Sequence, residues 1–170
     1  MNVTFEPVNW PVDVDEIVEL LVSNEWPFHG TARLTREQAA SITISDDDTV
    51  SFWVRADDRA VGLVRVFDLS DLDVGSPLFD LRLTRDQRGC GIGTMAVRWL
   101  TSHLFNTYPP LVRIEATTRH DNAAMQTVFD RCGYRHEGRL VEAWVSADGT
   151  RSDTLIYAIL RREWLQSAEV

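Results

Sequence analysis

A glycine-rich segment at residues 85–94, reading Arg-Asp-Gln-Arg-Gly-Cys-Gly-Ile-Gly-Thr, is the part of the sequence most suggestive of chemistry. It lies between a short apolar stretch and a long segment of helical periodicity, so it is expected to join a strand to a helix. Glycines at such a junction let several backbone N–H groups turn toward one point at the positive end of the helix dipole, where phosphate binds. The alternative is a tight turn in which glycine only relieves steric strain.

Two familiar phosphate loops do not fit this segment. A P-loop requires the pattern G-x-x-x-x-G-K-[ST], and no lysine stands near these glycines. A dinucleotide fingerprint, G-x-G-x-x-G, starting at Gly89 would need a glycine where the chain has Thr94. A nucleotide-binding domain is therefore disfavoured.

The pattern that the segment does contain is [R/Q]-x-x-G-x-G, formed by Arg88, Gly91 and Gly93. It resembles the acetyl-CoA pyrophosphate loop of the GNAT superfamily of N-acetyltransferases. A second block, residues 122–134, is similar to the family segment that starts with asparagine and ends with glycine and an aromatic residue. The two blocks follow in the family order. The turn at Gly149 and the ending at residues 152–157 look like the branch that includes ribosomal-protein N-terminal acetyltransferases.

The resemblance implies the fold and the cofactor. We expect a mixed α/β (α+β) GNAT fold, with a mostly antiparallel central sheet, helices on both faces and one splayed parallel strand pair, formed by a single domain over residues 1–170. The cofactor is expected to be acetyl-CoA. The residues that the resemblance assigns to it are Leu81, Arg82 and Leu83 beside the pantetheine, Arg88, Gly89, Cys90, Gly91, Ile92, Gly93 and Thr94 around the pyrophosphate, and Asn122 and Phe129 near the pantetheine arm.

The implied reaction is direct acyl transfer, in which an amine attacks the thioester carbonyl and a thiolate leaves. Only the neutral amine is nucleophilic, so its proton needs a route away. Glu115 is the first candidate to accept it, because alternation places it on the strand face opposite Ile114 and Ala116. Asp80 is the second candidate. The plainer alternatives are a salt-bridged Glu115 and an Asp80 that orients a loop.

Two positions depart from the family pattern. Phe129 stands where many members carry a tyrosine that protonates the leaving thiolate, so the general acid stays open. Val141 stands where this branch commonly carries an arginine that pairs with the acid at Asp153. The lost hydroxyl also keeps a second function open, a non-catalytic module that binds acyl-CoA as a sensor.

The acceptor is expected to be a primary amine of a small molecule or of a protein N-terminus. Trp26, Phe28 and His29 are candidates to line its pocket, although two neighbouring aromatics equally suit the core. Glu142 is a candidate to attract an ammonium group. The formal charge of −9 and the isoelectric point near 4.8 favour a cationic acceptor slightly and argue against nucleic acid as a partner.

The elements that must position these residues follow from the hydrophobic periodicity. Residue 35 with residue 38 fits a helix capping box. Helices are predicted over 13–22, 35–44, 92–108 and 122–132, strands over 50–55, 60–69, 78–83, 112–117, 138–145 and 154–160, and a turn-rich loop over 71–77. Helices and strands are mixed, which favours an α/β domain with one crossover helix between neighbouring strands.

Composition bounds the remaining choices. A chain of 170 residues with 44% hydrophobic residues fits one globular domain. No apolar run approaches the length of a membrane span, and the start lacks the pattern of a secretory signal. Two cysteines and four scattered histidines show no metal-ligand spacing. We therefore expect a metal-free cytoplasmic protein without membrane attachment, and the resemblance alone suggests a homodimer.

Overall fold

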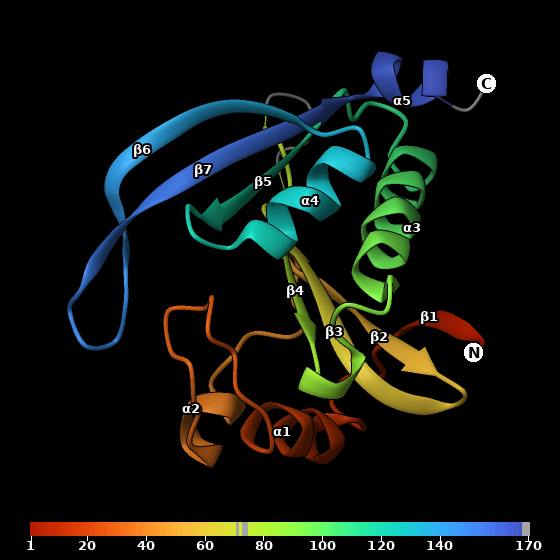
Figure 1. Cartoon of the computed structure of the whole chain (residues 1–170). Helices are drawn as coiled ribbons and strands as arrows, with labels where there is room; N and C mark the ends of the chain where they lie inside the picture. The colour runs from red at the N-terminus through yellow and green to blue at the C-terminus, as the bar shows by residue number, and fades with distance from the viewer. Residues whose placement is uncertain (71, 73–74, 168–170) are drawn as a thin grey trace.

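The computed structural model describes residues 1–70, 72 and 75–167, and its strands form two antiparallel sheets (Figure 1). Of the loop predicted at 71–77, residues 71, 73 and 74 lie outside the described residues. The first sheet has the order β1-β2-β3-β4 and the second has the order β5-β7-β6. The strands are β1 (Val3–Pro7), β2 (Val50–Ala56), β3 (Arg59–Phe67), β4 (Leu78–Leu83), β5 (Arg113–Arg119), β6 (Arg135–Val145) and β7 (Arg151–Leu160).

The helices begin and end close to the signals in the sequence. They are α1 (Val14–Val22), α2 (Arg36–Ala40), α3 (Ile92–Thr107), α4 (Ala123–Arg131) and α5 (Arg161–Ser167), with a 3-10 turn η1 (Arg85–Gln87) before α3. The predicted capping box is present, since the Thr35 hydroxyl accepts from the Gln38 backbone N–H and the Gln38 side chain accepts from the Thr35 N–H. Helix α2 ends at Ala40, four residues before the predicted end at residue 44. The β-branched residues 42–44 that follow favour an extended backbone, which explains the early end.

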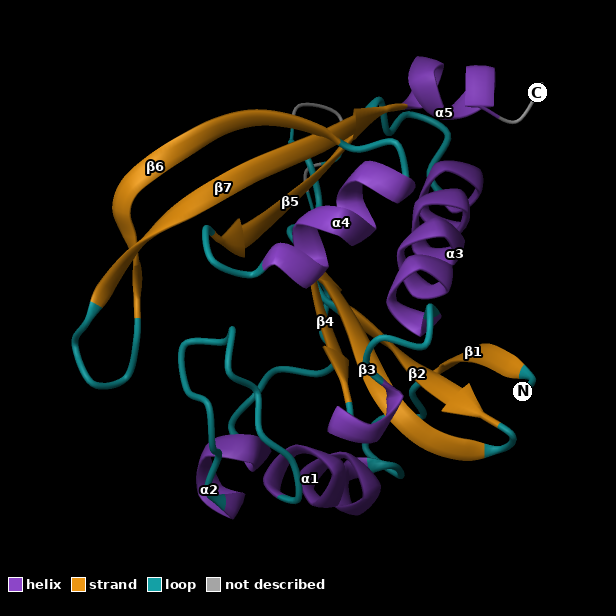
Figure 2. Ribbon diagram, in the orientation of Figure 1, coloured by secondary structure: helices purple, strands orange, loops and turns teal. Residues whose placement is uncertain are grey.

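The helices cover both faces of the first sheet (Figure 2). Because successive strand residues point to opposite faces, Trp53 packs in a cluster with the buried residues of α1 and α2, whereas Phe52 and Val54 pack in a second cluster with α3. The second cluster also contains Ile114 and other buried residues of β5 and β7, so it runs under both sheets. The architecture confirms the predicted mixed fold with helices on both faces.

The two sheets meet and part between β4 and β5. The backbone N–H of Glu115 donates to the carbonyl of Pro77 at 3.2 Å, so both strands start beside this bond. From there they run in the same sense, and no ladder joins them in the described part of the chain. Figure 1 shows β4 and β5 diverging from there. This is the splayed parallel pair that the family resemblance implies.

Two elements were not predicted. Strand β1 is short and follows the chain start, but Phe5 stacks on Trp99 of α3 with ring centroids 4.6 Å apart, which holds β1 at the sheet edge. Helix α5 is too short to show a clear period, and it is held by Trp164 packing on Phe105 with centroids 5.3 Å apart. Both are fixed by tertiary contacts rather than by local pattern. Among the described residues, no helix has the length and apolar character needed to cross a bilayer.

Candidate active site

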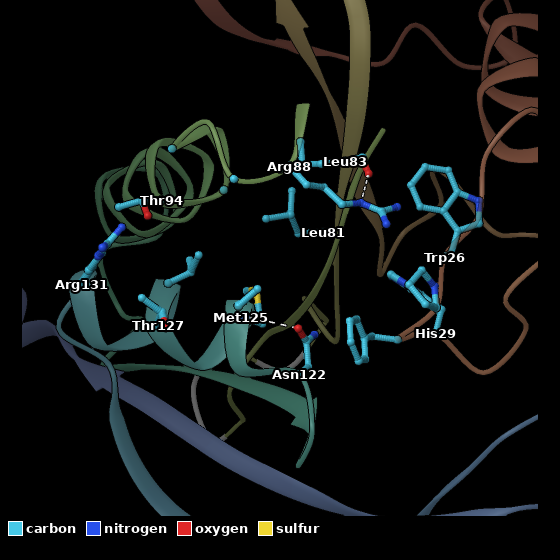
Figure 3. Close-up of a pocket in the computed structure, with 17 residues that line it drawn as sticks. Trp26, His29, Leu81, Leu83, Arg88, Thr94, Asn122, Met125, Thr127 and Arg131 are labelled. Carbon is cyan, nitrogen blue, oxygen red and sulfur yellow. Dashed lines mark hydrogen bonds between the residues drawn. The ribbon is translucent and has the colours of Figure 1, made fainter. Parts of the chain in front are cut away.

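A cavity of about 340 Å³ is lined by β4, the glycine loop, α4 and the loop over residues 26–29 (Figure 3). We call it the first cavity. Leu81 and Leu83 of β4 line its middle, Thr94 and Arg131 lie at one end, and Trp26 with His29 lies at the other. The remaining lining residues are Pro27, Phe28, Arg88, Gly89, Gly91, Gly93, Asn122, Ala124, Met125, Thr127 and Val128. Most of the predicted cofactor residues are therefore brought together around one elongated space.

The glycine loop has the backbone geometry that a phosphate cradle needs. Gly89 and Gly91 have φ of 77° and 87°, in the left-handed region that favours glycine, and Gly91 is the N-cap of α3. A Cβ added at either position would meet nothing within 4 Å, so open space lies beside the backbone there. Ile92 is fully buried in the core, which leaves only its backbone for a ligand. Cys90 is exposed and is absent from the cavity lining.

The exposed side chain of Arg88 acts as a clamp between two segments of the chain. Its Nε donates to the carbonyl of Leu83 at 2.9 Å and its Nη2 donates to the carbonyl of Glu25 at 2.6 Å. The guanidinium carbon also lies 5.8 Å from the ring centre of Trp26. Arg88 thus ties the end of β4 to the loop that carries the predicted acceptor residues.

That loop is anchored by Trp26, which is 1% exposed. The Trp26 indole N–H donates to the carbonyl of Leu21 at 2.8 Å, and its backbone N–H donates to Ala32 at 2.7 Å. Trp26 belongs to the core, which was one of the two predicted alternatives, and it also lines one end of the first cavity.

A second cavity, of about 310 Å³, adjoins the first. It is lined by Phe28, His29, Gly30, Arg65, Phe67, Phe79, Asp80, Leu81, Arg82, Thr117, Thr118, Asn122, Met125, Phe129 and Trp144. Five of these residues also line the first cavity, namely Phe28, His29, Leu81, Asn122 and Met125. The two cavities thus share a wall, which is the place where two ligands would meet.

His29 and Asp80, predicted for different roles, form a pair at this shared wall. The His29 Nε2 lies 2.7 Å from Asp80 Oδ1, and the other carboxylate oxygen accepts from Arg82 Nε at 3.0 Å. Burial opposes ionisation of Asp80, but His29 and Arg82 outweigh it and hold its pKa well below the usual range. When the imidazole is neutral and its Nε2 carries the hydrogen of this bond, Nδ1 holds the ring's lone pair.

Glu115 and Glu142 lie outside both cavity linings. Glu115 accepts from Arg113 Nε at 2.9 Å, the salt-bridged arrangement that was its plainer alternative. Glu142 is exposed on β6 with φ of 51°, at an irregularity in the pairing with β7. The position of Glu142 therefore does not bring it to the pair formed by His29 and Asp80.

The structure shows the surroundings of Phe129 and Val141, the two positions that differ from the family pattern. Phe129 is buried among aromatic rings, 4.7 Å from the ring centre of Tyr157, and lines the second cavity. Val141 is exposed, and Asp153 pairs with Arg139 instead while accepting from the Glu142 backbone N–H at 2.8 Å. An arginine two residues earlier thus supplies the pairing.

Asn122 combines two tasks. Its side-chain oxygen accepts from the Met125 N–H at 3.3 Å and caps α4, while its amide donates to the Thr118 hydroxyl at 3.1 Å. These bonds fix the part of the shared wall that α4 contributes.

The lining residues that sequence reasoning missed include Arg65, Met125, Arg131 and Trp144. Arg131 follows Ala124 by seven residues and Val128 by three on α4, the spacing of one helix face, so helical periodicity could have indicated it. Arg65 pairs across β3 and β4 with Asp80, which the register alone reveals. Trp144 reaches the cavity from β6, and no local signal identifies it.

The fold matches solved acetyltransferase structures along nearly its whole length. One is described as a probable acetyltransferase, with 21% identity and a TM-score of 0.77, covering 95% of this chain and 94% of that one. A spermidine N-acetyltransferase from Vibrio cholerae in complex with CoA and spermine has 21% identity and a TM-score of 0.75, covering 96% and 98%. An aminoglycoside acetyltransferase in complex with coenzyme A has 18% identity and a TM-score of 0.77, covering 98% and 99%.

No curated protein sequence matches the chain. At these identities the solved structures support the fold and nothing finer. The family follows from a different comparison, in which the model described as an acetyltransferase (GNAT) domain matches residues 2–135. With the glycine loop, the splayed strands and the cavity beside β4 in place, the chain belongs to the GNAT acetyltransferase family.

Proposed function

We propose that this acetyltransferase transfers the acetyl group of acetyl-CoA directly to a primary amine, with His29 as the general base and Asp80 as its partner. The observation that carries the proposal is the 2.7 Å bond between these residues at the wall shared by both cavities. A base placed there reaches a nucleophile in one cavity and an acyl group in the other.

The first cavity suits acetyl-CoA. Open backbone at Gly89 and Gly91 and the N-terminus of α3 would hold the pyrophosphate, with Arg131 nearby as a cation. Leu81 and Leu83 would contact the pantetheine. When bound, acetyl-CoA supplies the acetyl group as a thioester, whose carbon–sulfur bond breaks as the new carbon–nitrogen bond forms, and the electron pair leaves with the sulfur.

His29 provides the route for the amine proton. Its Nδ1 is buried and has no hydrogen-bond partner among the described residues, so its lone pair is free to accept a proton. The resulting imidazolium is stabilised by the ionised Asp80 at Nε2. Asp80 is thus a positioning residue, and Arg82 holds its second oxygen.

Amine-dependent thiol release and calorimetric titration with acetyl-CoA test the proposal together. We expect H29Q to lower kcat/KM by roughly 10²–10⁴-fold, the usual contribution of a general base, and to leave acetyl-CoA affinity near that of the wild type. D80N should lower kcat and alter its pH profile. E115Q tests the competing base, and we expect it to keep most of the activity because its carboxylate is engaged by Arg113.

Full activity of H29Q, or a loss confined to E115Q, would overturn the assignment of the base. Binding of acetyl-CoA without turnover of any amine would instead favour the sensor alternative. Within the family, the turn at Gly149 and the ending at residues 152–157 support placement in the ribosomal-protein-acetyltransferase-like branch. The limited volume of the second cavity favours a small amine over a protein N-terminus.

A further inference from the structure

The second cavity is lined by side chains with spare hydrogen-bond donors. Three buried side-chain nitrogens of the described residues lack a partner, and all three belong to residues that line this cavity: His29 Nδ1, Arg82 Nη1 and Trp144 Nε1. The first accepts a proton in the proposed reaction. The other two are obligate donors, and burying a donor without a partner is costly. Arg82 is only 8% exposed, so water does not readily satisfy it.

The cavity also has more positive than negative charge. Among the described residues that line it, Asp80 is the only acid, and it faces two guanidinium groups, with Arg82 Nε at 3.0 Å and Arg65 Nη1 at 3.8 Å. Burial lowers the pKa of Arg65, and the charge of Arg82 lowers it further, while Asp80 and Asp46 raise it. Within the cavity one carboxylate therefore faces two guanidinium groups, and a second anion would be favoured beside them.

The remaining lining is largely apolar. Aromatic side chains come from several elements, namely Phe28, Phe67, Phe79, Phe129 and Trp144. With a volume of about 310 Å³, the cavity fits a small molecule with an apolar body. We propose that the acceptor is a small aminocarboxylate, whose carboxylate binds Arg82 and Trp144 and whose amine faces His29. This inference rests on the proposed function and names the substrate class of the same site.

The inference departs from the expectation drawn from net charge. The formal charge of −9 favours a cationic acceptor, but the acids that produce it lie outside this cavity, apart from Asp80. A polyamine would bring further ammonium groups close to Arg65 and Arg82, where like charges repel. An aminocarboxylate offers one cation to the base and one anion to the spare donors.

A panel of matched amines tests the substrate class. Phenylalanine and leucine are each compared with their amides and with the corresponding decarboxylated amines, and spermidine is included as a polycation. Thiol release gives kcat/KM, corrected for the fraction of neutral amine. We expect the carboxylates to exceed their amides and amines by about tenfold or more, since a site built around polar groups rejects analogues that lack the partner. Equal rates, or a preference for spermidine, would overturn the inference.

Variants locate the recognition. W144F keeps the aromatic packing and removes one donor, and R82Q removes the cation. Each should lower the ratio of carboxylate to amide kcat/KM by about fivefold or more, and W144F should leave acetyl-CoA affinity unchanged. R36Q is the matched control, because Arg36 is exposed on α2, pairs with Glu19 and lines neither cavity. A ratio unchanged in both W144F and R82Q would contradict the proposal.

A measurement without variants covers the case in which R82Q does not fold. 3-Phenylpropionate, a carboxylate without an amine, should inhibit the wild-type enzyme competitively with the acceptor, whereas 3-phenylpropionamide should not. Inhibition by neither compound would count against carboxylate recognition. If the protein binds acetyl-CoA but acetylates no amine of the panel, the proposed function fails as well. If it acetylates amines without favouring carboxylates, only this inference fails.

Discussion

Single residues decide whether the glycine loop can hold a phosphate. The pattern of Arg88, Gly91 and Gly93 was enough to predict the loop, because a left-handed backbone at a helix start needs glycine. The partner of Asp80 could not be predicted in the same way. His29 lies 51 positions away, and only the folded chain brings the two side chains together. The same holds for Glu115, whose bond to Arg113 is a matter of side-chain geometry.

G91A is the sharpest test at this scale. Alanine disfavours the φ of 87° by about 1 kcal/mol, and the shifted backbone would misdirect the N–H groups of the loop. We expect acetyl-CoA affinity to fall by about tenfold or more in calorimetric titration. Gly138 provides the control, because its φ is not in the left-handed region and an added Cβ meets nothing within 4 Å. Wild-type affinity in G91A, or an equal loss in G138A, would contradict this role.

At the scale of elements, hydrophobic periodicity predicted most helices and strands, whereas the elements that tertiary contacts hold in place were not predicted. Strand β4 and helix α3 start where the sequence placed them, since each carries a strong pattern beside the glycine loop. Strand β1 and helix α5 were missed because packing on Trp99 and Phe105 holds them. The loop over residues 23–30 follows the helix predicted over 13–22, but its attachment to β4 through Arg88 depends on carbonyl positions that no pattern encodes.

Loss of this clamp should affect the loop more than the first cavity. R88M removes two hydrogen bonds from a charged donor, so we expect the free energy of unfolding to fall by about 1–2 kcal/mol in a urea titration. The KM for the amine should rise more than the Kd for acetyl-CoA, because the loop carries His29 and Phe28. R85M changes an exposed arginine of the adjacent η1 and should leave both constants near wild type. A larger effect on acetyl-CoA than on the amine would show that Arg88 serves the cofactor directly.

At the scale of the whole molecule, the net charge was a poor guide to the site. The chain is acidic, but the described lining of the second cavity has two arginines and a single carboxylate. Net charge counts mainly exposed groups in water, whereas a buried charge needs a partner close by, so the first does not predict the second. The mixed fold, with helices on both faces of the first sheet, was predictable from the order of elements. The second cavity was not predictable, since its lining residues come from the loop over residues 23–30 and from β3, β4, β5, α4 and β6 together.

Asp80 links several of these elements, so its ionisation should be visible in the stability of the whole fold. Its pKa is lowered in the folded state, so its contribution is present above the unfolded pKa near 3.9 and is lost as the pH falls below it. We therefore expect the difference in unfolding free energy between the wild type and D80N to be largest near neutral pH and to shrink below about pH 4. Urea titrations at several pH values measure it. A difference independent of pH would mean that Asp80 stabilises the fold without its charge.

The wall shared by the two cavities has a consequence for the order of events in catalysis. Since Phe28, His29, Leu81, Asn122 and Met125 border both spaces, the amine and the thioester can be on the enzyme at once. Cys90, the exposed thiol of the loop, lines neither space, so nothing in this arrangement calls for an acyl-enzyme. The kinetics should be sequential rather than ping-pong. A bisubstrate compound, with coenzyme A joined to an aminocarboxylate through the acetyl carbon, would fill both spaces and bind more tightly than either half alone.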